Sequence, residues 1–149
     1  MSLARLLFVL ILASLPAGLA HAEIRAPNPA PAKEVAPDAA GADAVVLRAL
    51  QAGLDNAFDK YLAEVAPDRC ESQEQRSQLQ RYEFKRFAAQ ASWYVSDAKK
   101  PAPQITQRQP QNDKKIKLFL KDIHNKDAMP RPIELSWKDG RWWITANSL

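Results

Sequence analysis

Apolar residues recur every three or four positions between Asp43 and Val65, which predicts a long amphipathic helix. The centre of the apolar stripe consists of Val46, Leu50, Leu54, Phe58 and Leu62. Asp43 is suited to cap the start, and Pro67 sets the end because proline disfavours helical backbone in the residue before it. Gly53 costs about 1 kcal/mol relative to alanine in a helix interior. Its presence indicates close approach by another element.

A second helix is expected from Ser72 to about Gln90. Ser72 and Gln75 have the spacing of a capping box, and apolar residues follow at helical steps. The segment Ser92–Asp97 is richer in residues that favour strands, so it is expected to be a strand.

Alternation of apolar and polar residues replaces the helical period in the second half of the chain. From Lys114 to Ile123, one side carries Ile116, Leu118 and Leu120, and the other carries Lys115, Lys117, Phe119 and Lys121. Gln104–Gln109 lies in a stretch with three prolines and is expected to be a short edge strand.

Two alternating segments separated by Asp139 and Gly140 predict a C-terminal hairpin, since Asp-Gly suits a two-residue turn. The expected pairs are Lys138 with Arg141, Trp137 with Trp142, Leu135 with Ile144, and Ile133 with Ala146. One face is then apolar and should pack on the first helix. Trp143 lies on the opposite face, beside Ser136.

The N-terminal segment has the three-part pattern of a secretory signal peptide. A cationic start with Arg5 precedes the ten-residue run Leu6–Leu15, of which nine residues are apolar, and Ala20, His21 and Ala22 fit a small-x-small cleavage site. The run is too short for a membrane span. The alternative is an apolar helix of the domain. We expect cleavage after Ala22, no transmembrane segment in the mature protein, and a periplasmic or secreted, bacterial product.

Residues 23–42 contain four prolines among alanines and little that can be buried, which is typical of a disordered linker. A proline-rich binding motif is the alternative. The predicted organisation is therefore a signal peptide (1–22), a linker (23–42) and one domain (43–149).

The helices followed by antiparallel strands predict an α+β domain, with amphipathic helices packed on a curved antiparallel sheet of three or four strands that ends in a hairpin. This layout, with the helix Val46–Val65 and the terminal pair Pro132–Ile144, resembles the nuclear transport factor-like (cystatin-like) α+β roll of small exported bacterial proteins. The resemblance implies a cone-shaped cavity between sheet and helix. Some members of that family are isomerases or dehydratases, and many are non-catalytic binding modules.

The composition disfavours several classes of protein and of functional site. The chain of 149 residues is 46% hydrophobic and 26% charged, which excludes a wholly disordered chain. After cleavage, Cys70 and His124 are its only cysteine and histidine, so we expect no disulfide framework, no metal site and no cofactor. Phosphate-loop, serine-elbow and zinc-helix motifs are absent, which disfavours an enzyme.

The charge is asymmetric. Residues 23–75 have a net charge of −5 and residues 76–149 a net charge of +8. We therefore place a hypothetical binding face on the basic, tryptophan-containing side of the sheet, and it consists of Lys115, Lys117, Lys121, Arg141 and Trp143. The expected partner is a protein or an anionic envelope polymer, not nucleic acid. The alternatives are a solvated face that guards a sheet edge and, for Trp143, burial under a helix or cover by an arginine.

Two further candidates stand beside this face. Asp122 and His124 could perform acid–base work at the mouth of a cavity, which would suit a small-ligand carrier or a weak isomerase-like enzyme, or His124 is an ordinary loop residue. Cys70 could pair two chains into a homodimer in an oxidising compartment, or it is a packed thiol.

Overall fold

Helix α1 (Ala39–Leu54) opens the part of the chain that the computed structural model describes, residues 37–97 and 99–149. The predicted signal peptide and most of the predicted linker lie outside the described residues. The side chain of Asp38 accepts a hydrogen bond from the Gly41 amide and caps α1. The prediction of Asp43 as the cap is wrong, and residues 39–42 are helical instead of linker. The carboxylate of Asp43 binds Arg108 of the sheet instead.

The predicted single helix to Val65 is also wrong, because the chain breaks after Leu54 and a short helix α2 (Phe58–Leu62) follows. Asn56 has a φ of 50°, in the left-handed region that asparagine tolerates better than most residues. The apolar pattern survives the break, since Tyr61 and Val65 are still buried.

A longer helical segment runs from α3 (Gln73–Gln78) through the π-helical turn η2 (Leu79–Phe84) to α4 (Lys85–Gln90), after the 3-10 turn η1 (Pro67–Arg69). Both hydrogen bonds of the Ser72 capping box are present, as predicted. The strand predicted at Ser92–Asp97 is wrong: a 3-10 turn, η3 (Ala91–Tyr94), continues the helix. Packing overrides strand propensity here, because this turn buries Tyr94 and leads into buried Val95.

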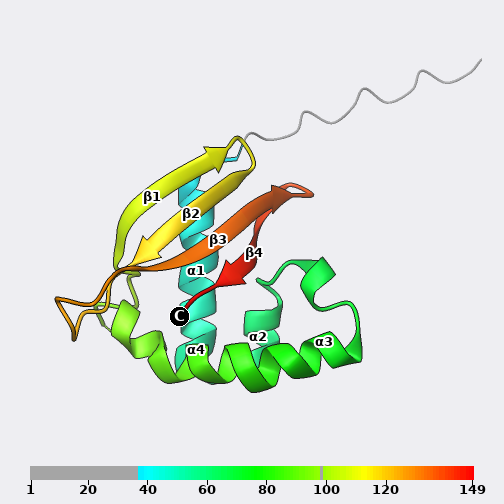
Figure 1. Cartoon of the computed structure of the whole chain (residues 1–149), viewed down its shortest axis with the longest axis horizontal. Helices are drawn as coiled ribbons and strands as arrows, with labels where there is room; N and C mark the ends of the chain where they lie inside the picture. Colours follow the sequence, from blue (N-terminus) through cyan, green and yellow to red (C-terminus); the bar gives the residue numbers. More distant parts are fainter. Residues whose placement is uncertain (1–36, 98) are drawn as a thin grey trace, which may run out of the picture. The chain divides into compact units, whose positions relative to one another are not determined.

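Four antiparallel strands form a curled sheet in the order β1-β2-β3-β4 (Figure 1). The strands are β1 (Ile105–Asn112), β2 (Lys115–Leu120), β3 (Arg131–Lys138) and β4 (Arg141–Asn147). The free side of β4 is covered, because Ile144 exchanges backbone hydrogen bonds with Glu64 and Ala66. Helices packed on an antiparallel sheet that ends in a hairpin confirm the predicted α+β class.

The core lies between α1, the segment α4–η3 and the inner face of the sheet. Its fully buried side chains include Leu50, Phe87, Leu118, Leu120, Ile133, Leu135 and Ile144. A Cβ atom added at Gly53 would lie 2.9 Å from the Cβ of Ala91 and 3.0 Å from a ring carbon of Phe87. This confirms that Gly53 permits close approach of another element. No helix in residues 37–97 or 99–149 is long and apolar enough to span a bilayer.

The C-terminal hairpin turns at Asp139 and Gly140, whose φ angles are 54° and 77°. Positive φ at both positions is the geometry for which Asp-Gly is selected. The pairs Trp137–Trp142 and Leu135–Ile144 are confirmed. A bulge after Glu134 places Asn147 opposite Ile133, so the expected pairing of Ile133 with Ala146 is wrong.

Candidate functional site: the outer face of the sheet

Trp142 and Trp143 point to opposite faces of the sheet. Trp142 is 5% exposed and lies against α1, where its indole N–H donates to the carbonyl oxygen of Asp38 at 2.8 Å. Its ring meets that of Trp137 edge-to-face at 5.6 Å. Trp142 therefore belongs to the core.

Trp143 is half-buried on the outer face. Its indole N–H donates to the carbonyl oxygen of Lys138 at 3.1 Å, and the guanidinium carbon of Arg141 lies 4.0 Å from the centre of its ring. Cover by an arginine, one of the alternatives for this residue, is thus present. The ring still forms part of the wall of a groove.

Arg141 is held over Trp143 by a buried carboxylate. Its Nη2 donates to Glu64 Oε2 at 2.9 Å and to the carbonyl oxygen of Ala63 at 3.2 Å. Glu64 is 7% exposed, and it also accepts two hydrogen bonds from Arg48, at 2.8 Å and 3.0 Å. Arg141 is therefore engaged within the protein, by a carboxylate that it shares with Arg48.

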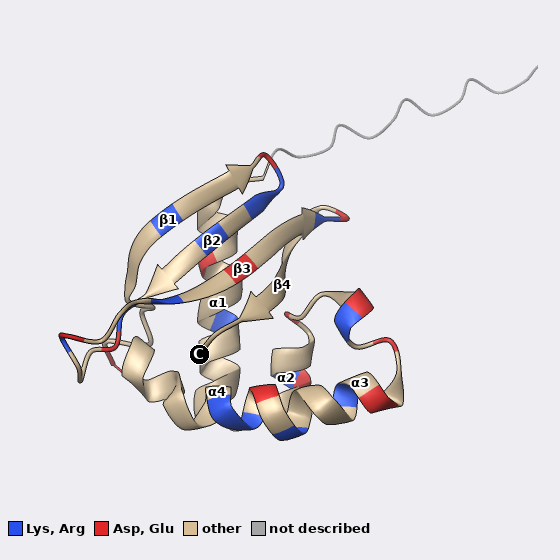
Figure 2. Ribbon diagram, in the orientation of Figure 1, with Lys and Arg blue, Asp and Glu red and all other residues tan. Residues whose placement is uncertain are grey.

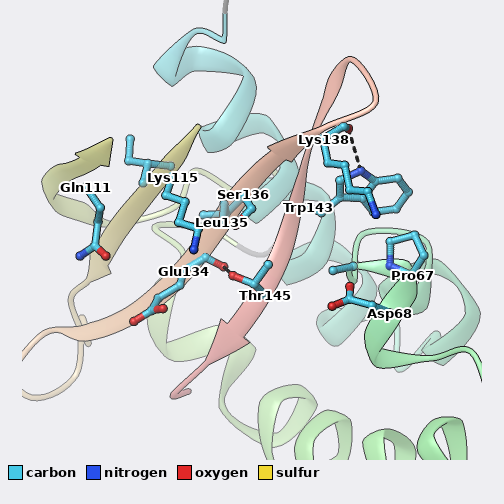
Figure 3. A pocket seen from close by; sticks show the side chains of 12 residues that line it. Pro67, Asp68, Gln111, Lys115, Glu134, Leu135, Ser136, Lys138, Trp143 and Thr145 are labelled. Carbon is cyan, nitrogen blue, oxygen red and sulfur yellow. Dashed lines mark hydrogen bonds between the residues drawn. The ribbon is translucent and has the colours of Figure 1, made fainter. Parts of the chain in front are cut away.

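A groove of about 510 Å³ lies between the outer face of the sheet and the segment 66–68, and we call it the sheet groove (Figure 3). Its lining consists of Ala66, Pro67, Asp68, Gln111, Lys115, Ile116, Glu134, Leu135, Ser136, Lys138, Trp143 and Thr145. Lys115, Ser136 and Lys138 make no side-chain hydrogen bond or ion pair with any described residue, and neither do Asp68 and Gln111. These polar groups are therefore available to a ligand.

The three lysines predicted on β2 do not act together. Only Lys115 lines the groove, where it is exposed. Lys117 is paired with Glu134 at 2.8 Å, and the Lys121 ammonium donates to the carbonyl oxygen of Lys126 at 2.6 Å, beyond the end of β2. Two of the three charges are therefore engaged within the protein.

Lys138 and Asp68 belong to the groove although neither was among the predicted site residues. Lys138 could have been found from the hairpin pattern, since it lies on the same face as Trp143. Asp68 reaches the groove because the segment after α2 lies along β4, and the sequence contains no local signal for that contact.

Asp122 and His124 lie in the loop between β2 and β3. The Asp122 carboxylate accepts hydrogen bonds from the backbone N–H groups of His124 and Asn125, at 2.7 Å and 3.2 Å. It therefore shapes the turn, and the exposed side chain of His124 makes no hydrogen bond or ion pair with it. Within residues 37–97 and 99–149, no group of three metal-ligand residues occurs.

Cys70 is a free, half-buried thiol at the margin of the core. Its sulfur lies 3.5 Å from the carbonyl oxygen of Pro67 and 3.7 Å from that of Ala66. Its pairing between two chains stays a prediction.

No model of a known protein family, no curated protein and no solved structure matches this chain. Its function is therefore inferred from the geometry of its own residues. The sheet groove offers an indole, two ammonium groups, a hydroxyl and an amide, which are groups suited to binding, together with the carboxylates of Asp68 and Glu134.

Proposed function

We propose that the protein is a non-catalytic, exported binding module, and that the sheet groove holds a carboxylate-bearing chain. The ligand is an acidic segment of a partner protein or an acidic envelope polymer, which share this chemistry. The cone-shaped cavity between sheet and helix is expected only from the resemblance to the nuclear transport factor-like roll.

The observation that carries the proposal is the contrast among the cations of the outer face. Lys117 is paired with Glu134 and Arg141 with Glu64, whereas Lys115 and Lys138 line the sheet groove with no acid partner among the described residues. A carboxylate between them gains charge-assisted hydrogen bonds, which are stronger than neutral ones. The half-buried ring of Trp143 supplies apolar contact area beside these charges.

Asp68 restricts the kind of chain that fits. It lies with Pro67 on the wall near Trp143, and its carboxylate is unpaired among the described residues (Figure 3). A ligand that places a hydroxyl or amide N–H there avoids repulsion. The carboxylates of the ligand are therefore expected beside Lys115 and Lys138, with another group of the chain facing Asp68.

The binding test uses two probes, poly-glutamate and polygalacturonate, which distinguish a protein segment from a glycan. The variant K115E/K138E should bind at least about tenfold more weakly, since each substitution replaces attraction with repulsion. K99E/K100E changes the net charge equally at exposed positions outside the groove and should bind like the wild type. Equal affinities of K115E/K138E and K99E/K100E would show that the probes do not bind in the sheet groove.

Export through residues 1–22 is part of the proposal and has its own test. Cleavage after Ala22 gives a mature chain that begins with Glu23. Intact-mass measurement of the periplasmic fraction and the culture medium should find this chain. A mass that includes residues 1–22 would contradict the proposed leader.

The alternative proposal is a small-ligand carrier or a weak isomerase-like enzyme with a cone cavity between helix and sheet. The inner-face residues Leu118 and Ile133 are fully buried, which favours the binding module. Binding of a small apolar dye in the interior, lost on D122N or H124A substitution, would favour the alternative instead.

A further inference from the structure

A second groove, of about 630 Å³, lies between the end of α1, the start of α2 and the segment η2–α4, and we call it the helical groove. It is separate from the sheet groove, since the two share no lining residue. Its lining includes Asn56, Phe58, Arg81, Phe84, Lys85 and Ala89.

The floor of the helical groove is apolar and its rim is basic. Phe84 is 4% exposed, and its ring lies 5.4 Å from that of the partly buried Phe58. On the rim, Arg81 and Lys85 are exposed and make no side-chain hydrogen bond or ion pair with the described residues. Figure 2 shows basic residues gathered around the start of α4.

Unusual backbone occurs on both walls. The π-helical turn η2 carries Arg81 and Phe84, and such turns inside longer helices are frequent at functional sites. On the opposite wall, Asn56 has a φ of 50°, a strained conformation for a residue other than glycine. Both features belong to the segments that shape the groove.

We infer that the helical groove binds an acidic amphipathic helix of a partner protein. A helix of this kind inserts apolar side chains at positions i, i+3 and i+4 between two helices. Arg81 and Lys85 are four residues apart and lie on one side of the helical segment, so they match two carboxylates spaced one turn apart on a partner helix. This inference goes beyond the proposed function, which concerns the other groove.

A membrane surface fits this groove less well. The apolar floor is recessed, since Phe84 is almost fully buried while the cations beside it are exposed. Side chains that project from a helix reach such a floor, whereas a flat bilayer surface meets the rim first.

The test is selection of binders from a displayed library of helical peptides, followed by affinity measurement on the enriched sequences. The inference predicts enriched peptides with helical apolar spacing and acidic residues one turn apart. R81E/K85E should weaken their binding at least about tenfold. K115E/K138E carries the same charge change in the sheet groove and should leave the affinity for these peptides unchanged. Failure of the proposal for one groove is therefore distinguishable from failure of the proposal for the other.

A steric variant makes the test independent of charge. Ala89 is exposed on the rim, so A89W should obstruct the groove without affecting the fold, which thermal unfolding checks. Enrichment of non-acidic peptides, binding that ignores both variants, or no enrichment would overturn the inference. Binding to phosphatidylglycerol vesicles that R81E/K85E abolishes would likewise overturn it and assign the groove to a membrane.

Discussion

The inner face of the β3–β4 hairpin buries Trp142 against α1, whereas the outer face leaves Trp143 half-buried beside the sheet groove. The indole of Trp142 is surrounded by core side chains and donates to the backbone at the start of α1. The indole of Trp143 contacts an arginine and lines a groove whose groups Lys138, Ser136 and Asp68 have no side-chain partner among the described residues. Two neighbouring residues of the same type thus have opposite environments.

The difference follows from the two-residue period of a strand. Because the period separates the two faces completely, one face can be optimised for packing and the other for recognition. Substitutions on the inner face should therefore lower the free energy of unfolding, and substitutions on the outer face should change binding. The predictions below test this division, from the largest expected effect to the smallest.

The substitution Trp142→Ala should lower the free energy of unfolding by about 3–5 kcal/mol, because it leaves a cavity in the core. Trp143→Ala should lower it by less than about 1 kcal/mol, the scale of an exposed cation–π contact. Urea titration of both variants measures the two values. Similar losses in the two variants would show that the faces are not divided in this way.

Removing the charge of Glu64 should cost more than removing that of Glu134. The side chain of Glu64 is 9% exposed and serves two arginines, while that of Glu134 is 43% exposed and serves Lys117 alone. Glu64→Gln is expected to cost about 2 kcal/mol and Glu134→Gln less than about 1 kcal/mol. Thermal unfolding compares them. A larger loss in Glu134→Gln would contradict this ranking.

Tyr61 is part of a polar network inside the fold. Its hydroxyl donates to Glu83 at 2.6 Å and accepts from Asn147 at 3.0 Å, and Arg69 also binds Glu83. Burial, followed by the charge of Glu83, raises the pKa of Tyr61 well above its ordinary value. As the pH rises, the Tyr61 hydroxyl therefore loses its proton in the unfolded chain before it does so in the folded protein. The contribution of this group to stability is present below about pH 10 and is lost as the pH rises above it.

The expected slope for this one group is at most about 1.4 kcal/mol per pH unit. Tyr61→Phe should flatten the decline of stability between about pH 10 and pH 11, and Tyr82→Phe, at an exposed position, should not. Urea titration across this range gives the slopes. Equal slopes in the two variants would rule out a titrating role for Tyr61.

Replacing Gly140 in the turn between β3 and β4 should lower the free energy of unfolding. Gly140 has a φ of 77° and open space around it, so Gly140→Ala meets backbone strain without a steric clash. We expect a loss of about 1 kcal/mol. A loss above about 3 kcal/mol, measured by thermal unfolding, would show that the turn has contacts beyond its backbone.

The elements that depend on neighbouring residues alone were predictable from the sequence. Strict alternation and the Asp-Gly turn were sufficient for the hairpin and for the opposite directions of Trp142 and Trp143, and the Ser72 capping box marked its helix. The break near Asn56 and the 3-10 turn at Trp93 were missed. In both places the apolar residues still reach the core, and it is the backbone between them that changes.

The groove was only partly predictable, because its charges depend on distant partners. Nothing near Lys117 in the sequence indicates that Glu134 neutralises it, and nothing near Arg141 indicates Glu64. The contacts join residues from different elements, so a count of basic residues overstates the free charge of the face.

The most direct test of the binding face is a titration of the ¹⁵N-labelled protein with poly-glutamate and, separately, with polygalacturonate, followed through the indole N–H signals. The account predicts that the signal of Trp143 shifts with at least one probe, together with the amides of Lys115 and Ser136, while the signal of Trp142 stays in place. Shifts confined to Trp142 or to the loop around His124, or an unchanged Trp143 signal with both probes, would contradict it.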